Sequence, residues 1–231
     1  MLRQALQEPQ CLSLAVERRG YASASHTAWQ DEASLQARTA SGGVLRAAQL
    51  WPAVVRTGLS AAYDLRAVAM GLHWLQQHPQ ASLLSVRVAV ASLADERWIE
   101  QLQQVLQQAP AVLSRLVLEL DGYAVVHHPG AAMELAAMAQ QLGVGIGLRS
   151  VERSLQGLLH MQALRPSYVK VSGHFAEQTV YNMGAAALLD AMLEAAQSVQ
   201  AQVLVVDPVS AAVAQGLQQR GAACLVSDAG D

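Results

Sequence analysis

The stretch that decides the fold is Leu164-Arg-Pro-Ser-Tyr-Val-Lys-Val-Ser-Gly-His-Phe175. Pro166 lies in a loop before a short apolar run, Tyr168 to Val171, and an alanine-rich segment with the composition of a helix follows. The run is typical of a buried strand, yet it contains Lys170. Because a buried ammonium group is unfavourable unless it faces a cavity or an opposite charge, Lys170 is the first candidate functional residue.

Strands and helices alternate on both sides of this stretch. We expect strands at 11–18, 32–39, 84–92, 114–120, 143–149, 167–172, 202–207 and 222–227. We expect helices at 45–57, 61–78, 95–108, 130–142, 154–163, 175–200 and 209–220. Short connections between such elements indicate a parallel sheet with right-handed crossovers. This many strands in 231 residues favour a closed α/β barrel, and without a repeat or linker we expect one domain, 1–231.

Composition and charge narrow the class of partner. With 52% hydrophobic and 14% charged residues, the chain is expected to form a large core. A net charge of −3 and the lack of a basic tract argue against direct nucleic-acid binding, and favour a protein or small-molecule partner. Cys11 and Cys224 lie far apart in the sequence and are expected to be reduced, as in a cytoplasmic protein. Apolar runs are too short for a membrane span or a signal peptide.

Two motifs resemble a known family. The pattern L-x-P-x-Y-V-K-V-x-x-x-F at 164–175 resembles the L-x-x-D-x-x-K-I-D-x-x-F signature of EAL domains, the cyclic di-GMP phosphodiesterases. The stretch Leu50 to Leu59, followed by Tyr63-Asp64, is similar to that family's F-I-P-x-A-E-x-x-G-L-I and its later L-D. The resemblance implies the EAL variant of the TIM (β/α)8 barrel, in which the first strand is irregular and chemistry sits at the carboxyl ends of the strands.

The family hydrolyses a phosphodiester with two metal ions held by carboxylates and an asparagine, assisted by a lysine and a glutamate. The resemblance identifies remnants of this site at Glu32, Glu119, Lys170 and Asp207. In the first motif, Glu32 or Ala33 matches the metal-binding glutamate, and both alignments stay open. The positions where ligands are replaced are Ala89, Gly122, Arg149, Ser150 and Ser172. An alanine methyl group cannot bind a metal, and an arginine at a ligand position repels the cation.

The resemblance and these replacements imply a domain that is not an enzyme, with no catalytic residue, metal or cofactor. We expect a protein-interaction module of a bacterial regulatory system, with a non-hydrolytic cyclic di-GMP receptor as the alternative. The segment from Gly58 to Leu93 is similar to the EAL part of the Csr-system regulator of small-RNA decay. That likeness implies a regulatory protein partner such as a phosphotransferase-system component. A third hypothesis is a new acidic metal site formed by Glu119, Asp121, Asp207 and Asp228.

Three further expectations concern local structure. We expect Lys170 to pair with Glu119 or Asp207 across the barrel mouth, because an unpaired buried charge is strongly destabilising. His127-His128 is expected to be a solvated loop. In helix 175–200, we expect one stripe to pack on the barrel, with contact to a protein or a second copy of the chain as the alternative. That stripe is Met183, Ala187, Leu188, Met192 and Ala195.

Overall fold

The computed structural model describes residues 11–22, 27–39, 42–207 and 210–227. The strands are β1 (Leu12–Ala22), β2 (Thr27–Arg38), β3 (Val44–Leu45), β4 (Leu84–Val88), β5 (Leu116–Asp121), β6 (Gly145–Arg149), β7 (Tyr168–Ser172), β8 (Gln202–Val206) and β9 (Ala223–Ser227). The α-helices are α2 (Ala47–Arg56), α3 (Ser60–Gln77), α4 (Val90–Leu93), α5 (Trp98–Gln107), α6 (Gly122–His127), α7 (Pro129–Leu142), α8 (Met161–Leu164), α9 (Gly173–Tyr181), α10 (Met183–Ser198) and α11 (Ala211–Gln219). Short 3₁₀ helices are η1 (Pro110–Arg115), η2 (Val151–Arg153) and η3 (Leu155–His160).

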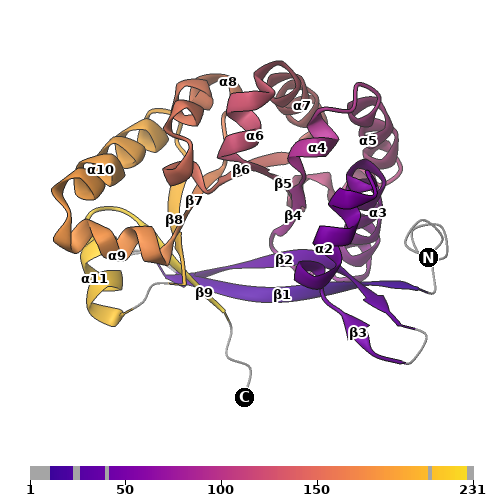
Figure 1. Ribbon diagram of the computed structural model, residues 1–231, viewed down its shortest axis with the longest axis horizontal. Coiled ribbons are helices and arrows are strands. Elements are labelled where there is room, and N and C mark those ends of the chain that lie inside the picture. The colour runs from indigo at the N-terminus through magenta and orange to yellow at the C-terminus, as the bar shows by residue number, and fades with distance from the viewer. Residues whose placement is uncertain (1–10, 23–26, 40–41, 208–209, 228–231) are drawn as a thin grey trace.

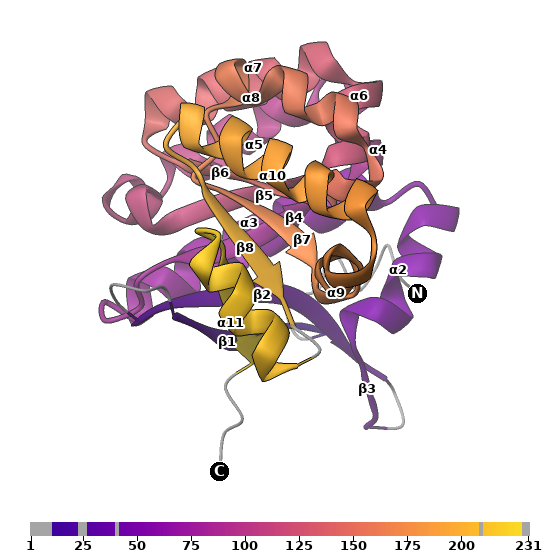
Figure 2. The same cartoon turned by 90° about the vertical axis from the view of Figure 1, so that its left-hand side faces the viewer.

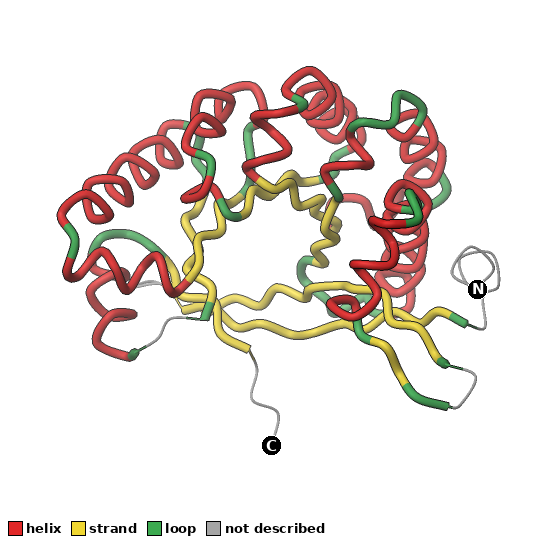
Figure 3. Tube along the Cα trace, in the orientation of Figure 1, coloured by secondary structure: helices red, strands yellow, loops and turns green. Residues whose placement is uncertain are grey.

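Eight of the strands close into a barrel. Their order is β1-β9-β8-β7-β6-β5-β4-β2, and pairing of β1 with β2 completes the ring, while β3 extends the sheet beyond β2. β1 is antiparallel to both of its neighbours, and the other barrel strands are parallel. The view into the ring shows β1 and β2 as its lower wall, with α3, α5, α7, α8 and α10 outside the other walls (Figure 1, Figure 3). The predicted α/β barrel with an irregular first strand is confirmed.

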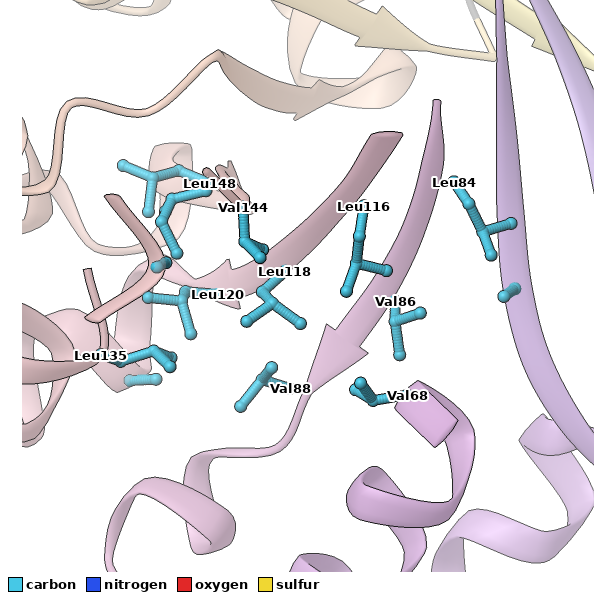
Figure 4. Close-up of a cluster of buried hydrophobic side chains, with 14 of the residues drawn as sticks. Val68, Leu84, Val86, Val88, Leu116, Leu118, Leu120, Leu135, Val144 and Leu148 are labelled. Carbon is cyan, nitrogen blue, oxygen red and sulfur yellow. The ribbon is translucent and has the colours of Figure 1, made fainter. Parts of the chain in front are cut away.

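Side chains along β4 and β5 point alternately to the outer and the inner face of the barrel wall. One set of side chains points outward and packs against Val68 of α3 and Leu135 of α7 (Figure 4). That outward set is Leu84, Val86, Val88, Leu116, Leu118 and Leu120, each at most 5% exposed. Burying an aliphatic side chain of this size contributes about 1.5–3 kcal/mol. The residues between them, such as Arg87 and Glu119, therefore point into the barrel.

The carboxyl ends of the parallel strands define the barrel mouth. In the side view, α2, α4 and α9 lie at the end toward which the strand arrows point (Figure 2). Below the mouth, the barrel interior is filled by an apolar floor of Leu83, Val117, Tyr168, Leu204 and Ala223. The next inward-facing residues toward the mouth include Glu119 on β5 and Lys170 on β7.

Several elements differ from their predicted bounds: β1 and β2 are longer than the predicted 11–18 and 32–39, and the helix predicted at 154–163 is η3 followed by α8. The strand predicted at 84–92 stops at Val88, because the chain turns into α4 where Asp64 accepts hydrogen bonds from the Ala89 amide and the Ser92 hydroxyl. The single helix predicted at 175–200 is two helices. Asn182 separates them, since its side chain accepts hydrogen bonds from the amides of Gly184 and Ala185 and so caps α10.

The stripe predicted on this helix was wrong as a single packed face. Met192 is fully buried, but Met183 is 91% exposed and Ala187 is also exposed. The buried face of α10 consists of Leu189, Met192 and Ala196 instead. All five residues of the predicted stripe lie within α10, after the break at Asn182, so the prediction placed the packed face of this helix at the wrong residues.

The solvated loop expected at His127-His128 was wrong in part, because His127 is exposed but lies in a helix. Asp121 caps this short helix by accepting a hydrogen bond from the Tyr123 amide, and His127 ends it with its ring tilted against that of Tyr123. Of the described residues, Cys11 is half-buried and Cys224 is buried, and neither is in a disulfide. Within the described ranges, no helix has the length and apolar character needed to span a membrane.

Candidate functional site

A buried ion-pair cluster occupies the barrel just above its floor. The Lys170 ammonium of β7 donates to Oε1 of Glu32 on β2 at 2.6 Å and to Oε1 of Glu119 on β5. Lys170 is 4% exposed and Glu119 is 1% exposed. Three strands therefore place one lysine between two carboxylates, as the predicted pairing of Lys170 with Glu119 requires. Glu32 is a second partner that the sequence did not reveal.

Neutral groups complete the cluster from below. The Tyr168 hydroxyl donates to Oε1 of Glu119 at 2.7 Å, and the Gln30 amide donates to the Tyr168 oxygen at 2.7 Å. Burial and the neighbouring Glu119 raise the pKa of Tyr168 well above its ordinary value, so the hydroxyl remains a donor. The Tyr168 ring has room only because Gly147 faces it: a Cβ there would lie 2.5 Å from the ring.

A layer of arginines lies above the cluster. Arg19 on β1 contacts Oε2 of Glu32 at 3.3 Å and Oδ1 of Asp207 at 2.9 Å. Arg87 on β4 lies 3.6 Å from Oε2 of Glu32 and 4.0 Å from Oε2 of Glu119. Burial by itself would raise the pKa of Glu32, but Lys170, Arg19 and Arg87 together lower it below its ordinary value. The cluster therefore keeps Glu32 ionised.

The alternative partner for Lys170 was wrong. Asp207 follows β8 and pairs with Arg19 instead, while Lys170 pairs with Glu32 and Glu119. Asp207 has a left-handed φ of 51°, which turns its backbone toward the start of α9. There, its carbonyl oxygen lies so close to Gly173 that a Cβ on Gly173 would be 2.1 Å away. Only glycine fits this approach without displacing the backbone.

Replacing Gly173 with Ala is therefore expected to lower the free energy of unfolding by about 1–3 kcal/mol, the usual range for overpacking. Gly216 in α11 is the matched control, because a Cβ there meets nothing within 4 Å. Gly216→Ala should raise the free energy of unfolding by about 0.5–1 kcal/mol. Urea unfolding of both variants measures the difference. Equal stability of the two variants would contradict the close approach.

The five positions identified as replaced ligands lie at the mouth, and each has a local structural role. Ala89 begins α4, Gly122 begins α6 against the backbone of Val151, and Ser172 caps α9 through the Phe175 amide. Arg149 ends β6 and donates to Asp121 at 3.4 Å. Ser150 follows it with a left-handed φ of 55°.

The proposed acidic set does not converge among the described residues. Glu119 faces Lys170, Asp121 faces Arg149 and Asp207 faces Arg19. Asp228 lies outside the described residues. Across the described part of the chain, no group of three or more His, Cys, Asp or Glu side chains is placed to hold a metal ion. The hypothesis of a new acidic metal site therefore has no support from the geometry of the described residues.

Asp64 is a buried acid that the sequence analysis named only as part of the Tyr63-Asp64 motif. It is 2% exposed, and its Oδ2 accepts hydrogen bonds from the Ala89 amide and the Ser92 hydroxyl, both at 2.7 Å. Burial raises the pKa of Asp64 to about 7, although the two hydrogen bonds lower it in part. The pKa of Asp64 therefore lies near neutrality.

Two adjoining clefts open at the mouth. The β1–β2 cleft, of about 480 Å³, is lined by charged residues, namely Glu17, Arg19, Glu32, Arg46, Arg87 and Glu119. The α2–α3 cleft, of about 540 Å³, is lined by Trp51, Pro52, Tyr63, Asp64, Asp121 and Arg149 and also by Arg87. Ala33, Ser34, Ala47, Ala48 and Arg87 line both clefts. The two clefts therefore meet at Arg87.

Arg87 and Arg19 are two of the residues at this site that sequence reasoning missed, and Gln30 and Tyr168 are two others. The sequence did contain a signal for Arg87. It lies between Val86 and Val88, and because side chains alternate along a strand, Arg87 points to the face opposite to these two valines. In a closed barrel that face is the interior. The signal for Arg19 was weaker, since it lies beyond the predicted end of its strand at residue 18.

The comparisons with known proteins identify the class. A model of the EAL domain family matches residues 22–226, which is most of the chain. The chain therefore belongs to the EAL family, whose usual members are cyclic di-GMP phosphodiesterases. No curated protein matches the chain.

Solved structures share the fold. The EAL domain of FimX from Pseudomonas aeruginosa, bound to cyclic di-GMP, has a TM-score of 0.81 at 21% identity, covering 98% of this chain and 91% of that one. The PaMucR phosphodiesterase in complex with cyclic di-GMP has a TM-score of 0.80 at 19% identity, with coverages of 98% and 92%. Apo LapD from Vibrio cholerae (S helix, GGDEF and EAL) has a TM-score of 0.84 at 15% identity; this chain is covered to 98% and spans about half, 54%, of that structure.

Proposed function

We propose that this chain is a catalytically inactive EAL domain that acts as a regulatory module through protein contacts in the bacterial cytoplasm. The observation that carries the proposal is the position of Arg87, whose guanidinium faces Oε2 of both Glu32 and Glu119. Lys170 faces Oε1 of both carboxylates. The two glutamates that could bind a metal ion thus face side-chain cations at both oxygens.

The donor set does not fit a pair of divalent cations. Such ions need several oxygen ligands that converge, and they are repelled by nearby positive charges. The chain has alanine, glycine and serine at Ala89, Gly122 and Ser172, and none of these supplies a carboxylate. Arg149 adds a further positive charge at the mouth, beside Asp121. These features support loss of hydrolysis.

An exposed apolar corner supports a protein contact. Where α9 meets α10, at the left edge of the molecule in Figure 1, Val180 is 55%, Tyr181 is 84% and Met183 is 91% exposed. Aromatic residues and methionine are enriched in protein interfaces, and methionine adapts to varied partners. The resemblance to the Csr-system regulator makes a phosphotransferase-system component the first partner to test, and a second copy of this chain the next.

Tyr181→Ser combined with Met183→Ser is expected to weaken partner binding by about tenfold or more, because interface aromatic residues often contribute over 2 kcal/mol. Leu159→Ser is the matched control, since Leu159 is 82% exposed on η3, away from this corner in sequence. Binding to purified phosphotransferase proteins measures the first partner, and sedimentation measures self-association. Equal losses in the corner variant and in the control, or no loss in the corner variant, would contradict a contact at this corner.

A second candidate function is a non-hydrolytic cyclic di-GMP receptor. The α2–α3 cleft favours it, because Trp51 and Tyr63 form an aromatic wall while Arg87 and Arg149 line the same cleft. A nucleotide base could stack on Trp51 or Tyr63, and a phosphate could contact Arg87 or Arg149. Calorimetric titration of cyclic di-GMP, with and without Mg²⁺, separates this function from the first. Micromolar binding supports the receptor, whereas no heat at high concentration leaves the protein-interaction module.

A further inference from the structure

Helix α2 lies at the surface, yet it is apolar on more than one side. Leu50 and Val54 are its buried side chains. On the other side of the helix is a row of exposed apolar residues at i, i+3, i+4 and i+7, a spacing that places them on one face. This α2 stripe is Ala48, Trp51, Pro52 and Val55. A helix that is apolar all round is normally covered all round, so the α2 stripe is a candidate contact surface.

Trp51 gives the stripe a fixed aromatic centre. It is 38% exposed, and its ring meets the ring of Tyr63 on α3 edge to face, with the centroids 5.9 Å apart. Val55, one helical turn further on, is 50% exposed. A tryptophan that a neighbour already holds in place loses little conformational freedom on binding, and tryptophan is enriched among the residues that dominate interface affinity.

Cations lie at both ends of the stripe. Arg46 precedes α2 and Arg56 ends it, and both are exposed. Neither forms an ion pair with a residue that the structure describes. The sequence contains no acidic residue between Glu32 and Asp64, so no carboxylate in the first turn of α2 offsets the positive end of the helix dipole beside Arg46. The complementary surface is apolar, with carboxylates at its two ends.

Charge also distinguishes between possible occupants. Two copies of the chain that met through α2 about a two-fold axis would bring arginine against arginine, which opposes self-association. The net charge of −3 opposes contact with an anionic membrane. The stripe borders the α2–α3 cleft, because Ala48, Trp51 and Pro52 also line that cleft. A row of side chains beside a groove is the surface along which a second helix packs.

We propose that the α2 stripe docks an amphipathic helix of a partner protein, whose apolar face covers Trp51 and Val55 and whose acidic ends pair with Arg46 and Arg56. This surface goes beyond the proposed function, which rests on the corner where α9 meets α10. With 10 residues, α2 is about 15 Å long, so a partner helix of about four turns spans both arginines.

A synthetic helical peptide is the direct probe. It has leucines at i, i+3, i+4 and i+7 and glutamates at both ends, and a control peptide has lysines in place of the glutamates. Fluorescence anisotropy should detect binding of the glutamate peptide to the full chain at concentrations up to about 1 mM, and the lysine peptide should bind about tenfold more weakly or less. Because exposed charges are screened by salt, high salt should reduce this difference.

Variants of exposed residues locate the contact. Val55→Asp should weaken binding of the glutamate peptide by about tenfold or more, because it places a charge in the apolar centre of the contact. Val55 lines neither cleft, so this change leaves both clefts intact. Reversing both charges, with Arg46→Glu and Arg56→Glu, should transfer the preference to the lysine peptide. Leu159→Asp is the matched control, because Leu159 is an apolar residue that is 82% exposed on η3.

Three results would overturn the docking surface in variants that circular dichroism shows to be folded. These are no binding of the glutamate peptide to the wild type, equal binding by the wild type and Val55→Asp, and an unchanged peptide preference after charge reversal. Dimerisation that Val55→Asp abolishes, measured by sedimentation, would overturn the partner helix in favour of a second copy. Binding to phosphatidylglycerol vesicles that depends on Val55 would overturn it in favour of a membrane surface.

The corner variant keeps this surface apart from the proposed function. Tyr181→Ser combined with Met183→Ser should bind the glutamate peptide as tightly as the wild type does, because the two residues lie on α9 and α10. Loss of peptide binding in the corner variant would overturn the assignment to α2. Peptide binding that depends on Val55 supports the docking surface even if no partner binds at the corner.

Discussion

Lys170→Met is expected to lower the free energy of unfolding by about 3–5 kcal/mol, the range for removing one partner of a buried ion pair. The ammonium of Lys170 contacts two carboxylates, and Glu119 is 1% exposed. Without Lys170, Glu119 would keep its charge in a buried site or bind a proton. Either outcome destabilises the folded chain.

Urea unfolding of Lys170→Met measures this loss at constant pH. Arg220→Met is a matched control, because Arg220 pairs with Asp190 at the surface, where an ion pair contributes roughly 0–1 kcal/mol. Adding Glu119→Gln to Lys170→Met should recover part of the stability, since the uncompensated charge is then removed. Equal losses for Lys170→Met and Arg220→Met would show that the buried cluster does not form as described.

Asp64→Asn is expected to make the chain more stable at pH 8 but not at pH 4. In the folded chain the pKa of Asp64 is about 7, against an ordinary value of 3.8. A raised folded pKa contributes stability that is present below pH 3.8 and is lost as the pH rises through 7. At about 1.4 kcal/mol per pH unit, the loss is on the order of 4 kcal/mol. Asparagine avoids it, because its side-chain oxygen can still accept both hydrogen bonds.

Urea midpoints of the wild type and Asp64→Asn at pH 4 and pH 8 test this expectation. Glu32 acts in the opposite direction, since its pKa is lowered and its contribution is lost only as the pH falls below its ordinary value of 4.5. That contribution is common to both proteins and cancels in the comparison. A constant difference between the two proteins across this range would mean that Asp64 is not buried as an acid.

The sequence predicts the barrel well because its signals are local. Apolar runs such as Leu116-Val-Leu118, separated by helical segments, predict the alternation of strands and helices without knowledge of any distant contact. The lysine in β7 could be predicted to have a carboxylate partner, because an unpaired ammonium in a buried strand is strongly destabilising. Its pairing with Glu119 followed from that reasoning.

The composition of the cluster could not be predicted in full, because it depends on closure of the barrel. Glu32 and Lys170 lie 138 positions apart, and they meet only because β2 and β7 face each other across the interior. Arg19 joins them through the antiparallel β1, whose extent was underestimated. The break at Asn182 was missed for a different reason: helical composition continues through it, and only the capping hydrogen bonds mark the end.

Turnover of cyclic di-GMP in the presence of Mg²⁺ or Mn²⁺ tests the central claim most directly. The wild-type chain is predicted to release no linear dinucleotide above the rate of a buffer blank, because Lys170 and Arg87 face the carboxylates that metal ions would need. Metal-dependent turnover that disappears in Glu119→Gln would contradict the account, and would make this chain an active phosphodiesterase.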